Sequence, residues 1–309
     1  MFLECIKEGF KLTHRNWQVI LLKIIVTIIS IAALFIFVGI PIAVAIIFMS
    51  IDIASLKDTL LNIMSSDPLE ILSKYLGLAV IVFTGLILYI TVVSVVVLYV
   101  FGGMLGVLRN ASLDSKYRFS FSSFFAEAKK LFFPLVWLFS VALFVITAVI
   151  IIFGILTGVG FFTVHALSTP DSTLSVFVVS FFTMLVIFLS LVAGLFSVIF
   201  TVYASIALAV ERKGVSDSFK KTWNFVMNKP GAFLFYILLV ICVVALNIVL
   251  WLLGASFRLI PMIGLIVSIP YQIILHVFQS YLAVVMWSSL IVYFIKGTKH
   301  TEYKATYDI

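Results

Sequence analysis

Residues 201–240 read TVYASIALAVERKGVSDSFKKTWNFVMNKPGAFLFYILLV, in which a basic and aromatic segment lies between two apolar runs. The full apolar runs extend over about 174–210 and 232–254. Each exceeds the roughly 20 residues that an α-helix needs to cross about 30 Å of hydrocarbon. The pattern therefore predicts two membrane spans, joined by a short loop on one side of the membrane.

Four further apolar runs, at about 22–49, 75–101, 132–164 and 266–295, meet the same criterion. They are continuous, whereas the strands of a membrane barrel alternate in polarity over about ten residues, so we expect helices. Of the 309 residues, 64% are hydrophobic and 11% are charged, against about 25% charged residues in a soluble domain. We therefore expect an all-α integral membrane protein, in which residues 1–309 form one polytopic domain with six transmembrane helices.

The basic residues are segregated between the two sides of these spans. Seventeen of the 20 Lys and Arg residues lie in four segments, and the three intervening segments hold only Lys57, Lys74 and Arg258. The rich segments carry Lys7, Lys11, Arg15, Lys23, Arg109, Lys116, Arg118, Lys129, Lys130, Arg212, Lys213, Lys220, Lys221, Lys229, Lys296, Lys299 and Lys304. Cytoplasmic loops are enriched in Lys and Arg, so we expect a multi-pass protein of the cell (inner or plasma) membrane with both termini in the cytoplasm. The net charge of +7 follows from this topology, and we expect no nucleic-acid partner.

The basic segments that precede spans one, three and five resemble one another. They read FKLTHRNW at 10–17, FFAEAKKLF at 124–132 and FKKTWNF at 219–225. Each places aromatic residues on one face of a helix and basic residues on another, which is typical of helices that lie in the membrane interface. We expect three helical hairpins, each preceded by a cytoplasmic interfacial amphipathic helix. The repeats would cover about 1–108, 109–210 and 211–309, and Pro134 and Pro230 would mark bends into the following spans.

The segment ERKGVSDSFKKTW at 211–223 resembles a signature of bacterial and archaeal six-span proteins. These are similar to the membrane domain fused to some glycerophosphodiester phosphodiesterases and to its standalone relatives. The resemblance covers the topology of the whole chain and the motif of about 25 residues. It implies a lipid-associated membrane module and assigns no catalytic residue to this chain.

The residues that would carry catalysis are dispersed. His14, His165, His276 and His300 fall on an inner terminus, an outer loop, a span and an inner tail, so we expect no metal site. The sequence has no phosphate-binding glycine loop after a strand, no HExxH and no GxSxG. We therefore expect no catalytic residues, no cofactor and no enzymatic activity.

Span six carries a polar face within the membrane. Gln272, His276 and Gln279 recur at helical spacing, and Asn247 on span five is a candidate partner. These side chains could line a path for a substrate, or they could form hydrogen bonds that hold two helices together. The sequence favours the second interpretation without excluding the first.

Small residues also recur at the spacing of close helix contacts. Gly102 and Gly106, and Gly154 and Gly158, have the GxxxG spacing. A third row, on span four, consists of Ser190, Gly194, Ser197, Thr201 and Ser205. We interpret these rows as packing seams, with a pore lining as the alternative.

Three classes of function are compatible with this sequence. The first is a non-enzymatic membrane protein that binds lipid or a partner in the cell envelope, where the partner could be another membrane protein or a soluble one. The second is a transporter or translocator of a lipid or other hydrophobic substrate, and the third a membrane-embedded enzyme. We favour the first, with interfacial lipid contacts at Arg15, Trp17, Lys129, Lys130, Lys220, Lys221 and Trp223.

Overall fold

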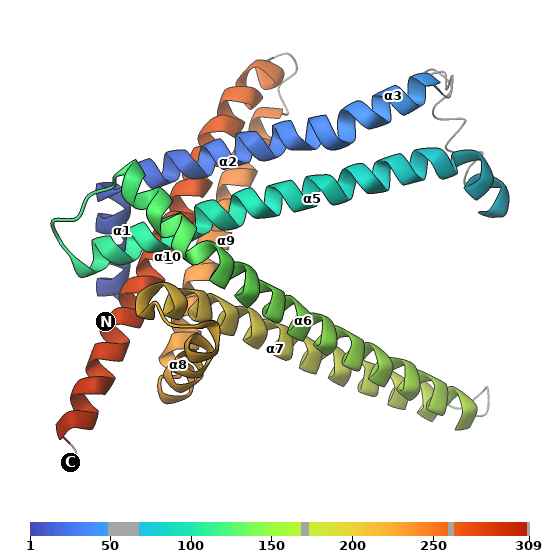
Figure 1. The fold of residues 1–309 in the computed structure, drawn as a ribbon. Helices are drawn as coiled ribbons and strands as arrows, with labels where there is room; N and C mark the ends of the chain where they lie inside the picture. The colour runs from blue at the N-terminus through green and yellow to red at the C-terminus, as the bar shows by residue number, and fades with distance from the viewer. Residues whose placement is uncertain (49–67, 168–172, 259–262, 308–309) are drawn as a thin grey trace. The chain divides into compact units, whose positions relative to one another are not determined.

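The computed structural model describes residues 1–309 except 49–67, 168–172, 259–262 and 308–309 (Figure 1). The described residues form helices and no strands. The helices are α1 (Phe2–Arg15), α2 (Gln18–Leu34), the π-helix η1 (Phe35–Gly39), α3 (Ile40–Phe48), α5 (Pro68–Leu113), α6 (Phe121–Leu167), α7 (Thr173–Glu211), α8 (Val215–Asn228), α9 (Gly231–Arg258) and α10 (Ile263–Tyr307). The predicted outer cation Lys57 lies outside the described residues.

Six of the described segments are long and apolar enough to cross a membrane, which confirms an all-α membrane protein. They are Gln18–Val44, Leu76–Leu113, Phe121–Gly160, Phe177–Glu211, Gly231–Ser256 and Val267–Thr298. Several extend beyond the predicted runs, because the helices continue into the polar residues at their ends. Arg109 is one such residue, and it lies inside α5.

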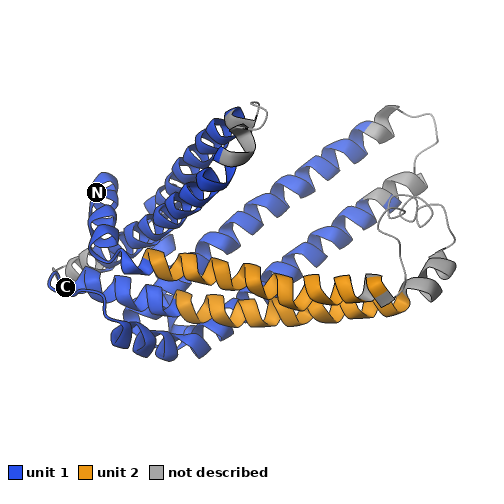
Figure 2. Ribbon diagram, turned by 90° about the horizontal axis from the view of Figure 1, so that it is seen from above, with its two compact units in different colours: residues 1–19, 102–309 blue, residues 20–101 orange. Residues whose placement is uncertain are grey.

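The chain forms two compact units (Figure 2). Unit 2 comprises residues 20–101 and therefore holds α2, η1, α3 and most of α5. Within it, a Cβ added at Gly85 would meet the backbone carbonyl of Phe37, so Gly85 lets the backbone of α5 come close to η1. The π-helical turn at Phe35–Gly39 widens the helix at this point of contact.

Unit 1 comprises residues 1–19 and 102–309, and its buried residues gather at one end of each of its long helices. In α6 the last buried residue is Ala142, and in α9 it is Leu239. In α10 the buried residues extend from Leu275 to Gly297. We call this region the packed core. It includes the sixth candidate span, in which 67% of the most apolar window is buried.

An aromatic cluster joins five helices within the packed core. The ring of Tyr293 in α10 lies 5.7 Å from Phe2 of α1, 6.0 Å from Phe225 of α8 and 4.6 Å from Phe235 of α9. Tyr203 of α7 packs 5.4 Å from Phe225, and its hydroxyl donates to the carbonyl of Ala232 at 2.9 Å. Aromatic rings at these separations attract one another, and this attraction adds to the hydrophobic free energy of the area that they bury.

In two of the three basic segments, the expected amphipathic helix is separate from the span that follows it. α1 and α8 are helices of 14 residues that end shortly before the following span. Pro230 lies between α8 and α9, as predicted. In the remaining segment α6 continues through Pro134 from Phe121 to Leu167, so the interfacial segment and the span form one helix there. A proline removes a single backbone hydrogen bond, and the leucines at 131, 135 and 138 hold both sides of it in the packed core.

Candidate functional site

The predicted polar face on span six is only partly brought together. Tyr271 of α10 packs against Gly254 of α9, and its hydroxyl donates to the carbonyl of Leu250. The two helices are antiparallel neighbours, so this register brings His276 level with Asn247. Gln272, in contrast, is exposed.

Several polar atoms near this level are buried. Asn247 Nδ2 donates to the carbonyl of Val243 in its own helix at 2.8 Å. The other amide atom, Asn247 Oδ1, is buried without a hydrogen-bond partner among the described residues, as are His276 Nε2 and Ser280 Oγ. Gln279 is half-buried. These atoms are candidates for hydrogen bonding between α9 and α10 or to a polar group that enters from the membrane.

The predicted lipid-contact residues separate into two groups. Five of them are exposed: Trp17, Lys129, Lys130, Lys220 and Trp223. The other two, Arg15 and Lys221, contact protein groups. Lys221 Nζ lies 3.5 Å from a carboxylate oxygen of Glu211.

Arg15 binds the end of another helix. Its guanidinium donates to the carbonyl of Ser115 at 2.6 Å and to that of Asp114 at 3.5 Å, and it also donates to the carbonyl of Ala111. The last carbonyls of a helix lack partners within the helix and carry partial negative charge, which favours a cation there. Arg15 therefore caps the end of α5, and its predicted lipid contact stays a prediction.

In each of the three basic segments, one aromatic side chain points away from the packed core. The exposed fractions are 52% for Trp17 and 51% for both Phe125 and Trp223. The buried faces instead carry mostly small or polar residues, at positions that correspond when Phe10, Phe125 and Phe219 are aligned. These buried residues are Gly9, Thr13 and Asn16 in α1, Phe124, Ala128 and Leu131 in α6, and Ser218, Thr222 and Phe225 in α8.

Each buried face packs against a different long helix. In α1, Thr13 shares a hydrogen bond of 3.0 Å with Ser288 of α10, and a Cβ at Gly9 would lie 2.9 Å from the backbone nitrogen of Ser289. In α6, Phe124 lies against Gly103 of α5, where an added Cβ would be 2.5 Å from its ring. The helix α8 packs against α7.

The glycine seams have different outcomes. Gly102 and Gly106 form a close contact, because an added Cβ would lie 3.2 Å from Leu135 and 2.8 Å from Glu127 Cγ, respectively. The prediction of a seam at Gly154 and Gly158 was wrong, because no atom of the described residues lies within 4 Å of a Cβ added at either position. The burial of α6 ends before this part of the helix.

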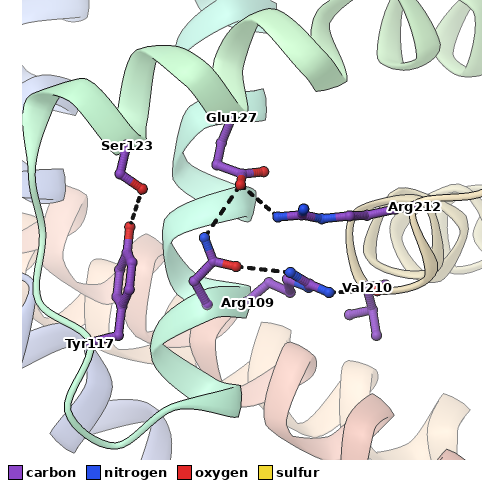
Figure 3. Close-up of polar contacts among 7 residues, drawn as sticks. Arg109, Tyr117, Ser123, Glu127, Val210 and Arg212 are labelled. Atoms are coloured by element: carbon purple, nitrogen blue, oxygen red, sulfur yellow. Dashed lines mark hydrogen bonds and ion pairs between the residues drawn. The ribbon is translucent and has the colours of Figure 1, made fainter.

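A charged network, which was not predicted from the sequence, links the ends of three helices (Figure 3). Arg212 Nη2, just after α7, donates to Glu127 Oε1 of α6 at 2.6 Å. Asn110 of α5 donates to the same oxygen at 3.4 Å and accepts from Arg109 Nη1 at 2.9 Å. The side chain of Glu127 is 9% exposed, whereas that of Arg212 is 40% exposed.

The backbone at Arg212 contributes to this geometry. Its φ of 56° lies in the left-handed region, which is common after the last turn of a helix but usually occupied by Gly or Asn. This conformation ends α7 and turns the guanidinium towards Glu127 (Figure 3). The only sign of this ion pair in the sequence is Glu127 itself, an acidic residue just before Lys129 and Lys130. Its partner Arg212 lies 85 residues further along the chain.

A cation also contacts a late turn of α10. Lys229, which follows α8, donates from Nζ to the carbonyl of Gly297 at 2.6 Å. Burial lowers the pKa of this ammonium group. Among the described residues, no three His, Cys, Asp or Glu side chains are grouped as metal ligands.

Comparison with known proteins found no matching family model, curated protein or solved structure.

Proposed function

We propose that this chain is a non-enzymatic polytopic membrane protein that associates with lipids through its three basic, aromatic segments, with both termini in the cytoplasm. The observation that carries the proposal is the exposure of Trp17, Phe125 and Trp223, while the buried faces of α1, α6 and α8 pack against protein. Exposed aromatic side chains beside Lys are typical of surfaces that meet lipid headgroups.

The recurrence of buried positions supports three structural repeats. Positions equivalent to Gly9 and Thr13 are buried in all three segments, and each segment packs against a different long helix. The helix α1 meets α10, the start of α6 meets the end of α5, and α8 meets α7. In the proposed scheme the last helix of each repeat therefore packs against the basic segment that begins the next repeat. The last helix of the third repeat, α10, packs against α1 of the first.

The resemblance of residues 211–223 to phosphodiesterase membrane domains also accords with a lipid-associated module. In this proposal the exposed Lys129 and Lys130 attract anionic headgroups, at about 1 kcal/mol for each Lys near the membrane surface. Trp17 holds its helix at the interface through its amphipathic ring.

Native mass spectrometry tests the lipid association. Protein exchanged into an equimolar mixture of anionic phosphatidylglycerol and zwitterionic phosphatidylcholine is expected to retain the anionic lipid preferentially. Replacing Lys129 and Lys130 with Gln should lower that preference, by up to about fivefold for each Lys. Trp17→Ala should lower total retention, whereas Trp251→Ala serves as the matched control, because Trp251 is 62% exposed but lies within a span.

The same lipid count and the same anionic preference in all of these variants would contradict the proposal. The orientation is tested separately with single cysteines and a membrane-impermeant thiol reagent. Asn62→Cys and Asp171→Cys should react from outside the cell, and Asp217→Cys should react only after the membrane is opened. The opposite pattern would contradict a cytoplasmic location for the termini.

A further inference from the structure

A cavity of about 340 Å³ lies among α6, α7 and α8 within unit 1. We call it the α8 cavity. Four aromatic side chains line it, Phe196 and Phe200 from α7 and Phe219 and Trp223 from α8, opposite Ala142 and two valines of α6. Its volume is at the lower end of the range for small-ligand sites, which is about 300–1,000 Å³.

The aromatic residues make the wall between α7 and α8 continuous. The rings of Phe200 and Phe219 are stacked, with centroids 5.7 Å apart and planes inclined by 9°. Trp223 lies edge-on to both Phe196 and Phe200, with centroids 6.3 Å apart in each pair. Because Trp223 is half exposed, one edge of this aromatic wall lies at the protein surface.

The two hydroxyl side chains of the cavity are already used within α7. Ser197 Oγ donates to the carbonyl of Ala193 at 2.8 Å, and Thr201 Oγ1 donates to that of Ser197 at 2.7 Å. Neither proton is therefore available to a ligand. The cavity wall therefore presents an apolar surface that suits a hydrocarbon chain. Ser197 and Thr201 belong to the row of small residues that was predicted to pack against another helix.

A cation stands beside the aromatic face of α8. Lys220 follows Phe219 and precedes Trp223 by three residues, so it lies on the adjoining face of the helix. Its side chain is exposed. An apolar cavity with a basic residue at its margin matches the two parts of an anionic phospholipid.

We propose that the α8 cavity holds one acyl chain of an anionic phospholipid, whose phosphate lies beside Lys220. The proposal rests on the lipid association proposed above and adds a defined site to it. A chain that leaves the bilayer for this cavity gains no hydrophobic free energy, because lipid tails are equally apolar. Its preference for the site comes from dispersion contacts with the rings and from the attraction between Lys220 and phosphate.

Photocrosslinking tests the site in the full-length protein in nanodiscs. The probe is phosphatidylglycerol with a diazirine on one acyl chain, used as a minor component of phosphatidylcholine bilayers. Adducts mapped by mass spectrometry are expected to concentrate on Phe196, Phe200 and Trp223. The comparison residues are Phe181 and Phe188, which are on the same helix as the first two and are 63% and 61% exposed.

Variants that fill the cavity separate a bound chain from the lipid that surrounds any membrane protein. Ala142→Phe and, independently, Ser197→Leu should reduce the adducts at the cavity to the yield at Phe181. Gly194→Leu is the matched control on α7, because a Cβ there meets no described atom within 4 Å. Lys220→Gln should lower the advantage of the phosphatidylglycerol probe over a phosphatidylcholine probe by about fivefold.

Equal adduct yields at the cavity and at Phe188, or cavity adducts that persist in both filled variants with native helicity, would overturn the proposal. If that occurs while lipid retention still depends on Trp17, Lys129 and Lys130, the interfacial association stands and the α8 cavity is surrounding lipid only. The converse result would contradict the interfacial proposal instead. In that result the filled variants lose the cavity adducts, and lipid retention does not change when Trp17, Lys129 and Lys130 are replaced.

Discussion

The contact between α1 and α10 predicts that Gly9→Ala destabilises the protein. The new methyl group would lie 2.9 Å from the backbone nitrogen and 3.0 Å from Cα of Ser289. Neither atom can move unless a helix moves. Overpacking of this kind costs about 1–3 kcal/mol, and replacing Gly by Ala inside a helix recovers about 0.5–1 kcal/mol. We therefore expect a net loss of up to about 2.5 kcal/mol in the free energy of unfolding.

Cys5 reports on the same contact. It lies one turn before Gly9 on the buried face of α1 and has no exposed surface, and burial raises the pKa of its thiol. Because the thiolate is the reactive form, Cys5 should be alkylated slowly by N-ethylmaleimide. If α1 detaches more often in Gly9→Ala, the rate should increase about tenfold for a loss of about 1.4 kcal/mol.

Both measurements use a Cys242→Ala background, because Cys242 is exposed. Unfolding is followed by circular dichroism in mixed micelles with increasing dodecyl sulfate, and alkylation by intact mass. Gly158→Ala is the matched control, since no described atom lies within 4 Å of its Cβ. It should be neutral or slightly stabilising. Indistinguishable unfolding curves and Cys5 rates for the two variants would refute the close packing of α1 on α10.

Three further perturbations have defined outcomes. A double-mutant cycle of Glu127→Gln and Arg212→Gln, measured by the same unfolding assay, should give a coupling of about 1 kcal/mol, because solvent screens the half-exposed Arg212; additive effects would contradict the ion pair. Tyr203→Phe should cost about 0.5–1.5 kcal/mol in thermal unfolding, since it removes a buried hydrogen bond to the carbonyl of Ala232, and an unchanged midpoint would count against that bond. Arg15→Lys should speed hydrogen exchange in the last turn of α5, because an ammonium group cannot reproduce the planar fork of contacts; equal exchange would show that the cap is not needed.

Much of the fold follows from hydropathy and length. The six candidate spans are predictable because about 20 apolar residues have few alternatives to crossing a bilayer. The seam at Gly102 and Gly106 was also predictable from spacing. The same spacing at Gly154 and Gly158 makes no contact with the residues that the structure describes, because GxxxG permits close approach but does not supply a partner.

The orientation of the basic segments could not be predicted from their own pattern. An amphipathic sequence identifies an apolar face, but either lipid or protein can cover it. In α8 the aromatic Trp223 remains exposed, and Ser218 and Thr222 are buried instead. Small side chains let the backbone approach another helix closely, and that preference becomes visible only when the partner helix is placed.

The charged contacts depend on distant parts of the chain. Glu127 and Arg212 are separated by 85 residues, and Arg15 reaches the carbonyl of Ser115 across 100 residues. Each was read from its local context as one of many cations and anions that flank spans. A single sequence gives no means of pairing them, because any Glu in the basic segments could meet any of several Arg residues.

The pairing of α1 with α10 also has a consequence for biosynthesis. The hydrogen bond between Thr13 and Ser288 joins residues that are 275 positions apart. Because translation adds roughly 5–20 residues per second, α10 is synthesised about 15–55 s after α1. During this interval Gly9, Thr13 and Asn16 need another environment, which the headgroup layer of the membrane can supply. The helix α1 is thus translated well before the helix that buries it, and its packing waits for the insertion of the sixth span.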